Sequence, residues 1–393
     1  MRGMRIAVLI ATVAVFAASA SGLEIAAVSD FQIVARLTGT PSVNNTTTSM
    51  NIGGTDIGMT VNHDGKTYFL FGDTFSGADP DAGGSWRRNA MAWTTDTSPA
   101  DGIVFGDWLK NLTTGYAKGA FSNNQPTGSG VITNIPTGGI SANGNLYVWF
   151  MNVNQWGPAG GEWYISQAEL AKWGGGNTTF SIRSGCVFPS NTNFGMVAAR
   201  EGVAGDPYIY LWGTPPGRFD GVKLARFLPA DIEDRSAYEF YDGTVGGAPQ
   251  WTSDEFVADQ IVPAPVGEMS VMYNEAVGEW TMMYFNEIDD RFEIRQSPTP
   301  WGTWSDPVTV MTMGQCPSGT YGIYAPMMNP LWVEDDGETI YFTMSLWVPY
   351  DVYLAKATLN LVPEPATLAL FGACAVALLK SRRSARLIQE RSV

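Results

Sequence analysis

Short apolar runs alternate with polar turns along most of the chain, and five of these runs share one layout. In each, a turn containing glycine or aspartate is followed at once by a strand-like run rich in aromatic residues. The five aromatic runs are residues 68–71, 146–150, 208–212, 280–285 and 340–344. Apolar positions with helical spacing are nearly absent between them. The pattern predicts an all-β fold that contains five hairpins.

The regular spacing of the hairpins favours a particular architecture. Evenly spaced hairpins in a chain rich in glycine and aromatic residues are typical of a β-propeller, in which each blade is a small antiparallel sheet. We therefore expect a single five-bladed β-propeller domain over residues 21–361. A two-sheet sandwich stays open as an alternative, because the spacing of short strands does not by itself separate the two architectures.

The first hairpin carries two aspartates near one end. Apolar runs at 57–61 and 66–71 flank the polar residues 62–65. If residues 62–65 form the loop, Val61 pairs with Lys66, Asp56 lies opposite Phe71, and Asp73 is a diagonal neighbour of Asp56, about 7–8 Å away. Two carboxylates at such a distance suit glycoside hydrolysis. The alternative is that Asp56 caps a strand and Asp73 forms a turn.

The strand that precedes each aromatic run lies nearer the centre of a propeller, so its first residues are expected to face the ligand-binding mouth. These starts are residues 55–58, 136–139, 193–196, 267–270 and 321–324, and only the first and fourth contain acids, Asp56 and Glu268. We expect Asp56 and Glu268 to face each other across a funnel, with Asp73 beside Asp56. Tyr324, in the fifth start, is a candidate substrate-binding residue.

Three of the 14 tryptophans fall at strand exits, where their rings are free to bind sugars. They are Trp86, Trp156 and Trp347. Flat apolar faces suit the faces of sugar rings, whereas the alternative role for any tryptophan here is packing between blades. We expect these three to contribute to substrate binding.

The two ends of the chain indicate export. Residues 1–20 combine Arg2 and Arg5 with an apolar run and a small-residue cleavage site, which predicts a secretory signal peptide. Residues 362–393 begin with Val-Pro-Glu-Pro, continue with an apolar stretch at 366–379 and end in a basic tail. This order resembles the PEP-CTERM sorting signal, which implies processing by an exosortase-type partner and a location in the cell envelope or outside the cell. An ordinary C-terminal membrane anchor is the alternative, although the apolar stretch is shorter than the 17–25 residues of a typical span.

Charge and composition exclude several classes of function. Seven of the 23 basic and two of the 38 acidic residues lie in the end segments, so the central part carries a net charge near −20 and is unsuited to nucleic acid or an anionic membrane. The one histidine, His63, falls in an expected turn, which leaves little for a Ser-His-Asp triad or a histidine-rich zinc site. We expect no cofactor and no metal. An acidic loop at 77–81 is more simply a surface loop than a Ca²⁺ site, and whether Cys186 and Cys316 pair is open.

Several short segments together resemble the domain of unknown function 4185 family, whose characterised members founded glycoside hydrolase family 183. The matching segments are residues 54–58, 71–75, 86–89, 213–219, 267–274 and 347–354. The resemblance implies a five-bladed propeller and, for those members, endo-acting cleavage of D-arabinofuranan. It implies Asp56, Asp73 and Glu268 as catalytic residues. It also implies that Arg88, Asn89, Thr214 and Arg218 bind sugar hydroxyls or orient the acids, unless they only hold loops against blades.

The leading hypothesis is an exported glycoside hydrolase that acts on furanoside-containing or related polysaccharide through Asp56 and Asp73. One protonated carboxyl would donate to the leaving oxygen while an ionised one attacks the anomeric carbon or activates water. The alternative is a non-catalytic lectin or matrix protein that binds extracellular polysaccharide in the same funnel. A purely structural matrix component is a third option.

Overall fold

The computed structural model describes residues 23–121, 130–158, 160–203 and 205–363. The chain divides into a central unit, Glu24–Val362, and a second unit formed by the two ends. The expected signal peptide and most of the expected sorting segment lie outside the described residues. The all-β prediction is confirmed for the central unit, where the one α-helix, α1 (Thr46–Met50), has five residues and the other helical segments are single 3₁₀ turns.

The central unit contains six antiparallel sheets, five of them with four or more strands. The first sheet holds β3 (Met59–His63), β4 (Lys66–Phe71), β7 (Ala90–Thr94) and β8 (Asp107–Trp108). The second holds β9 (Thr133–Ala142), β10 (Asn145–Trp156), β11 (Trp163–Trp173) and β12 (Phe180–Pro189). The third holds β13 (Met196–Glu201), β14 (Ile209–Thr214), β15 (Val222–Phe227), β16 (Glu239–Val245), β17 (Ala248–Thr252) and β18 (Gln260–Val262).

The remaining sheets complete the unit. The fourth holds β19 (Met269–Asn274), β20 (Glu279–Asn286), β21 (Arg291–Ser297) and β22 (Val308–Thr312). The fifth holds β23 (Tyr321–Glu334), β24 (Thr339–Val348), β25 (Asp351–Pro363) and the N-terminal β1 (Leu23–Arg36). A small three-stranded sheet of β2 (Gly54–Thr55), β5 (Thr74–Phe75) and β6 (Trp86–Arg87) lies beyond the end of the first.

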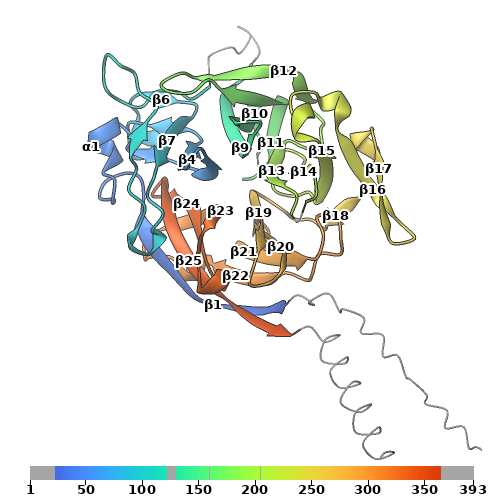
Figure 1. Cartoon of the computed structure of the whole chain (residues 1–393). Helices are drawn as coiled ribbons and strands as arrows, with labels where there is room; N and C mark the ends of the chain where they lie inside the picture. The colour runs from blue at the N-terminus through green and yellow to red at the C-terminus, as the bar shows by residue number, and fades with distance from the viewer. Residues whose placement is uncertain (1–22, 122–129, 159, 204, 364–393) are drawn as a thin grey trace, which may run out of the picture. The chain divides into compact units, whose positions relative to one another are not determined.

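All five expected hairpins are present, and their first strands neighbour one another in a closed sequence. The hairpins are β3–β4, β9–β10, β13–β14, β19–β20 and β23–β24. Strand β3 contacts β9, β9 contacts β13, β13 contacts β19, β19 contacts β23, and β23 contacts β3. The five larger sheets therefore stand around one central axis, as Figure 1 shows, with the N-terminal ends of these strands brought together.

The turn of the first hairpin differs from the expected one. The loop has two residues, Asp64 and Gly65, instead of four, so His63 pairs with Lys66 and Met59 with Leu70. Both loop residues have positive φ, 47° and 69°, as a tight turn matching the twist of the strands requires. The expected pairings of Val61 with Lys66 and of Asp56 with Phe71 are therefore wrong.

The new register brings Asp56 level with Asp73. Thr55 pairs with Thr74 in the small sheet, and the Gly72 amide donates to the Asp56 carbonyl at 3.2 Å. Ile57 and Gly58, both with positive φ, interrupt the first strand between the two ladders. Gly72 is needed at its position, because a Cβ there would lie 2.4 Å from Asp56 Oδ1.

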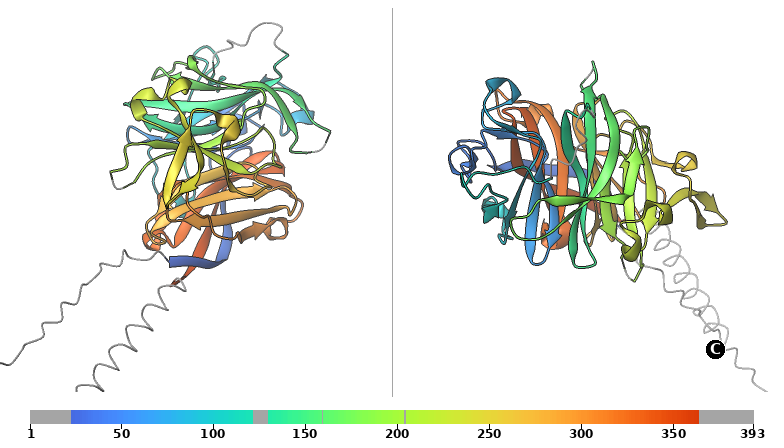
Figure 2. Two further views of the ribbon diagram at one scale, coloured as in Figure 1. Left: turned by 90° about the vertical axis from the view of Figure 1, so that its right-hand side faces the viewer. Right: turned by 90° about the horizontal axis from the view of Figure 1, so that it is seen from above.

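The first strand of the unit completes the last sheet. Strand β1 pairs with β25, and the views of Figures 1 and 2 agree in placing the two strands side by side. Just beyond β1, the Leu37 amide donates to the Val352 carbonyl at 2.8 Å. The buried carboxylate of Asp351 forms an ion pair with Arg36 and accepts a hydrogen bond from Thr38 Oγ1 at 2.8 Å. Hydrogen bonds and a charge pair thus fix the two ends of the unit together.

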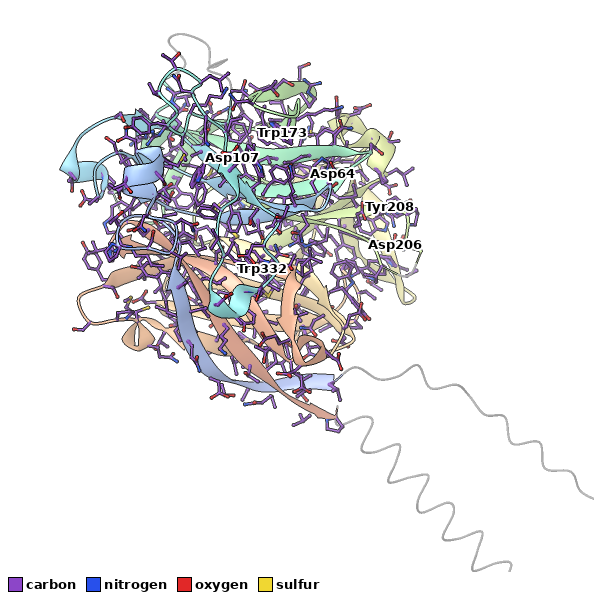
Figure 3. The ribbon with its side chains drawn as sticks, turned by 60° about the vertical axis from the view of Figure 1, so that its left-hand side comes forward. Asp64, Asp107, Trp173, Asp206, Tyr208 and Trp332 are labelled. Carbon is purple, nitrogen blue, oxygen red and sulfur yellow. The ribbon has the colours of Figure 1, made fainter. Side chains whose placement is uncertain are left out.

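Aromatic side chains pack between neighbouring sheets, as their strand pattern predicts. Phe69 of β4 contacts Trp332 of β23 with ring centroids 5.7 Å apart, and Trp212 of β14 contacts Trp280 of β20 at 5.3 Å. Figure 3 labels Trp332. Each of the four rings is at least 98% buried. These contacts join consecutive sheets into one core.

The hairpin turns hold acids away from the mouth. Asp64 lies in the β3–β4 turn and Asp206 precedes β14, and both are labelled in Figure 3. Asp206 accepts hydrogen bonds from the Tyr208 amide at 3.1 Å and the Tyr210 hydroxyl at 2.7 Å. His63, expected in the turn, is the last residue of β3, where its Nδ1 is 2.8 Å from Ser141 Oγ. The contacts of Asp206 and His63 are structural.

Candidate active site

A cavity of about 700 Å³ lies at the N-terminal ends of the inner strands, and most of the expected site residues line it. It collects all three expected catalytic acids, Asp56, Asp73 and Glu268. Five of the eight expected substrate-binding residues also line it: Trp86, Trp156, Arg218, Tyr324 and Trp347. Residues more than 200 positions apart in the sequence therefore meet in one place.

Asp56 is a buried acid with a strongly raised pKa. It follows β2, and its side chain is 8% exposed. The Tyr324 hydroxyl donates to Asp56 Oδ2 at 3.1 Å. Burial and the nearby charge of Asp73 raise the pKa of Asp56 to about 8, against the lowering effect of the Tyr350 and Tyr324 hydroxyls. At neutral pH the folded protein therefore holds Asp56 mainly in its protonated form.

Asp73 follows β4 and has polar partners that Asp56 lacks. Its Oδ1 accepts hydrogen bonds from Thr133 Oγ1 at 2.6 Å and from Trp86 Nε1 at 2.8 Å. Burial raises the pKa of Asp73 to about 6, while these two hydrogen bonds and the nearby Arg88 charge oppose the rise. Asp73 is therefore mainly ionised at neutral pH. The pair combines one proton donor with one carboxylate.

The protonation of Asp56 predicts a pH-dependent stability that an Asp56→Asn variant removes. Below about pH 4 the carboxyl is protonated in both the folded and the unfolded chain, so it imposes no cost. Between about pH 4 and 8 the unfolded chain releases this proton while the folded one retains it, so wild-type stability falls as pH rises. Relative to the wild type, the free energy of unfolding of the variant should therefore rise by a few kcal/mol from pH 5 to pH 8. A tenfold difference in proton affinity between the folded and unfolded chains corresponds to about 1.4 kcal/mol.

Urea unfolding of both proteins at several pH values measures this difference. Asparagine has the shape of the protonated acid, so the two proteins should be close in stability below about pH 4, where the acid is protonated in both the folded and the unfolded chain. A stability difference that stays constant across the range would contradict the raised pKa of Asp56.

Glu268 is fixed by an arginine that spans two acids. Arg218 donates to Glu268 Oε1 through Nε at 3.1 Å and Nη2 at 2.7 Å, and to Glu287 Oε2 through Nη1 at 2.8 Å. Its guanidinium also lies 5.1–5.2 Å from the ring centroids of Trp163, Phe285 and Tyr324. Burial lowers the pKa of Arg218, but the two ion pairs outweigh it and raise the pKa. The arginine therefore orients Glu268 instead of being free for a ligand.

The exposed tryptophans are all at the cavity. All 14 tryptophans lie within the described residues, and the three exposed ones are Trp86, Trp156 and Trp347, with 43%, 43% and 48% of their surface exposed. All three line the cavity. Exposing a large apolar ring costs free energy unless a ligand or partner covers it. Their gathering at one cavity indicates a surface suited to flat, partly apolar ligands.

Three expected substrate-binding residues lie outside the cavity lining and hold the scaffold. Asn89 is buried, and its Oδ1 accepts hydrogen bonds from the Ala120 amide at 2.7 Å and the Phe121 amide at 3.2 Å. Thr214 is fully buried at the end of β14. Arg88 donates to Asn134 Oδ1 at 3.4 Å, and it acts on the site through its charge on Asp73 and through its guanidinium, 5.9 Å from the ring centroid of Trp86.

The sequence patterns did not single out Tyr350, Thr133 or Glu287, which all act on the acids. Tyr350 lies in a segment that carries the family resemblance, and this is the signal that could have found it. Its backbone carbonyl accepts from the Thr55 amide at 2.8 Å, which holds the Asp56 segment in place. Thr133 and Glu287 stand 60 and 19 positions from the acids that they support, and no motif marks them.

The described residues show no group of three or more histidine, cysteine, aspartate or glutamate side chains arranged to hold a metal ion. Asp79, in the acidic loop considered for Ca²⁺, instead caps a 3₁₀ turn, where its Oδ1 accepts from the amides of Asp81 and Ala82 at 2.8 and 2.7 Å.

Cys186 and Cys316 are free thiols. Within the same residues, no helix is both long enough and apolar enough to span a bilayer.

Several solved structures are similar to this one at low sequence identity. A Bacteroides ovatus protein, named only as a candidate hydrolase, matches with a TM-score of 0.57 and 15% identity over 79% of this chain and 87% of its own. A family 117 glycoside hydrolase of Zobellia galactanivorans matches with a TM-score of 0.46 and 10% identity, over 87% and 94%. A GH43_1 enzyme of Xanthomonas citri in complex with xylotriose gives 0.45 and 12%, over 79% and 90%. No curated protein sequence matches the chain.

Two family models match the sequence and confirm both expected resemblances. A PEP-CTERM protein-sorting motif covers residues 361–384, which implies export and association with the cell envelope. The second model covers residues 41–356, which includes every side chain that lines the cavity. The chain belongs to the family described as a domain of unknown function, DUF4185.

Proposed function

We propose that this protein is an exported glycoside hydrolase, with the five larger sheets acting as the five blades of a propeller. The closed sequence of contacts among the five inner strands supports that blade count. The sorting motif supports processing by an exosortase-type enzyme. In this proposal the cavity at the N-terminal ends of the inner strands is the active site.

The observation that carries the proposal is a pair of carboxyls with separated pKa values in a cavity edged by exposed tryptophans. Burial brings the pKa of Asp56 to about 8 and that of Asp73 to about 6. Two acids whose surroundings separate their pKa values in this way divide acid and base roles. Tryptophan faces suit sugar rings, and all three exposed tryptophans are at this cavity.

The proposed reaction assigns one step to each acid. Asp56, protonated at neutral pH, donates its proton to the glycosidic oxygen as the bond to the anomeric carbon breaks. Asp73, ionised, either attacks the anomeric carbon or removes a proton from the attacking water. Glu268, held by Arg218, places a third carboxylate where positive charge develops on the sugar ring. If Asp73 attacks the sugar, the ionised Asp56 takes a proton from the water that hydrolyses the glycosyl ester, which restores both acids. If Asp73 instead takes the proton of water, Asp73 releases a proton to solvent and Asp56 takes one up.

The substrate follows from the family resemblance alone. Characterised relatives in glycoside hydrolase family 183 imply a furanoside polysaccharide, with D-arabinofuranan as the nearest case. We extend this to furanoside-containing or related glycans.

A reducing-end assay tests the proposal. Purified protein is incubated with arabinans, arabinogalactans and bacterial extracellular polysaccharides, and new reducing ends are counted over time. Hydrolysis by the wild type and its loss in Asp56→Asn would support the assignment. Saturable binding with no new reducing ends on any glycan that binds would instead establish a lectin, and the hydrolase proposal would fail.

A further inference from the structure

The cavity has an uneven distribution of charge. Its lining contains six carboxyl side chains and one guanidinium. The acids are Asp56, Asp73, Glu162, Glu268, Glu287 and Asp290. Even with Asp56 protonated, five carboxylates face one cation across about 700 Å³. Like charges confined between low-dielectric walls repel an entering anion more strongly than they would in open solvent.

The single guanidinium is not available to compensate a bound anion. Arg218 is 14% exposed, and its Nε, Nη1 and Nη2 already donate to Glu268 and Glu287. Arg88 lies outside the cavity lining and donates to Asn134 Oδ1 and the Val131 carbonyl, although its guanidinium lies 5.9 Å from the ring centroid of Trp86. An anionic sugar entering the cavity would therefore find no unpaired cation among the described residues that line it.

Asp56 and Glu268, which both line the cavity, each have one buried carboxyl oxygen without a hydrogen-bond partner among the described residues. Glu268 is 6% exposed, and its Oε2 makes no hydrogen bond within the described structure, although its Oε1 is held by Arg218. A buried carboxylate oxygen without a donor costs free energy until a ligand supplies one. A sugar hydroxyl or a protonated amine supplies such a donor, whereas a uronate or sulfate group brings only acceptors.

Three of the other acids, Glu162, Glu268 and Glu287, gather around Arg218 on one side of the cavity. The backbone at Gly161 accepts from the Arg218 amide at 3.0 Å, and a Cβ at Gly161 would lie 3.3 Å from Glu287 Oε2. The loop that carries Glu162 is thus packed against Glu287 and Arg218. The exposed Trp156 belongs to the same hairpin, because it pairs with Trp163, the residue after Glu162. The acids on this side of the cavity therefore adjoin a tryptophan face.

We propose that the cavity selects neutral or amino-substituted, positively charged sugars and excludes uronic and sulfated ones. This inference rests on the proposed function, because it names the substrate class of the same site. The tryptophan faces receive the apolar face of the sugar, and the acidic side receives its hydroxyl or ammonium donors.

Quenching of tryptophan fluorescence tests the charge of the cavity without requiring the true substrate. Caesium, iodide and acrylamide at equal ionic strength act as cationic, anionic and neutral probes of the three exposed tryptophans. We expect caesium to reach them at least about threefold better than iodide, relative to acrylamide. A Glu162→Gln/Asp290→Asn variant should shrink this ratio, and Asn suits the positive φ of 49° at position 290. Glu275→Gln, an exposed acid outside the cavity, should leave it unchanged.

Equal access of caesium and iodide in the wild type, or a ratio that the double variant does not change, would overturn the proposal. Calorimetry with three oligosaccharide probes gives a second measurement: chitosan, chitin and galacturonate oligomers, which are cationic, neutral and anionic. We expect galacturonate oligomers to bind at least about tenfold more weakly than the tighter of the other two, and equal or tighter binding would overturn the proposal. If none binds, the quenching ratios decide.

These measurements separate the failure of this inference from that of the hydrolase proposal. Binding that follows the charge order without hydrolysis would remove the hydrolase proposal and retain the selectivity. Hydrolysis of galacturonate oligomers would remove the selectivity and retain the hydrolase proposal.

Discussion

Replacing Asp56 by asparagine should lower kcat/KM by about 10²–10⁴-fold, the usual contribution of a general acid. Asparagine retains the size of the protonated carboxyl and its place beside Tyr324 but has no proton to transfer. Reducing-end kinetics on a glycan that the wild type cleaves measures the loss. The pH profile of wild-type kcat/KM should be bell-shaped, falling below about pH 6 as Asp73 is protonated and above about pH 8 as Asp56 ionises.

Asp64→Asn is the matched control for this substitution. Asp64 lies in the turn of the same hairpin, is exposed, and does not line the cavity. Asparagine tolerates its positive φ of 47°, so the control should keep wild-type activity. An Asp56→Asn enzyme with more than about a tenth of wild-type activity at pH 7 would exclude Asp56 as the proton donor.

Replacing Arg218 by methionine should destabilise the protein by about 3–5 kcal/mol, the usual cost of breaking a buried ion pair from one side. Glu268 and Glu287 would lose their shared cation, and Glu268 is only 6% exposed. The stems of the two side chains are similar in size, so the loss of charge should dominate. Urea unfolding at pH 7 measures the change in the free energy of unfolding.

Two further variants separate charge from packing at Arg218. Adding Glu268→Gln to Arg218→Met removes the unpaired carboxylate and should restore part of the lost stability. Arg183→Met breaks a more exposed pair with Glu233, 3.7 Å apart, and should cost less than about 1 kcal/mol. A loss below about 1 kcal/mol for Arg218→Met would show that the pair with Glu268 is solvent-screened.

The strand pattern predicts the fold well because its signals are local. Each aromatic run follows a turn whose residues favour reversal of the chain, and each forms the second strand of a hairpin. The start positions also place Asp56, Glu268 and Tyr324 at one cavity, since hairpins that repeat in sequence bring equivalent positions together. Only the direction of each inner strand is needed to predict this meeting.

Details that depend on contacts between sheets escape such an argument. A two-residue turn replaces the expected four-residue loop because Asp64 and Gly65 both adopt positive φ, and the difference moves Asp56 from Phe71 to the level of Asp73. Thr133 reaches Asp73 from the neighbouring sheet, and nothing in the local sequence around Thr133 encodes that approach. Conversely, Asn89 and Thr214 match family segments but are buried in the scaffold.

The roles expected of the tryptophans and of Arg218 depended on exposure, which sequence specifies poorly. Eleven of the 14 tryptophans are partly or fully buried, so a tryptophan in a strand is usually a packing residue. Trp86, Trp156 and Trp347 differ because each comes at the end of a strand or in a short strand at the cavity edge. Arg218 had two expected roles, and its hydrogen bonds to Glu268 and Glu287 favour orientation of the acids.

The pairing of β1 with β25 imposes an order on folding. The two strands are separated by more than 300 residues, so the fifth sheet can be completed only after nearly the whole central unit has left the ribosome and crossed the membrane. Contacts between such distant segments form slowly, and until then β1 is an unpaired strand edge open to association with other chains. A chain that stops before Asp351 would lack both the partner strand and the carboxylate that holds Arg36. Completion of β25 thus distinguishes a full-length chain from a truncated one before the protein reaches its destination.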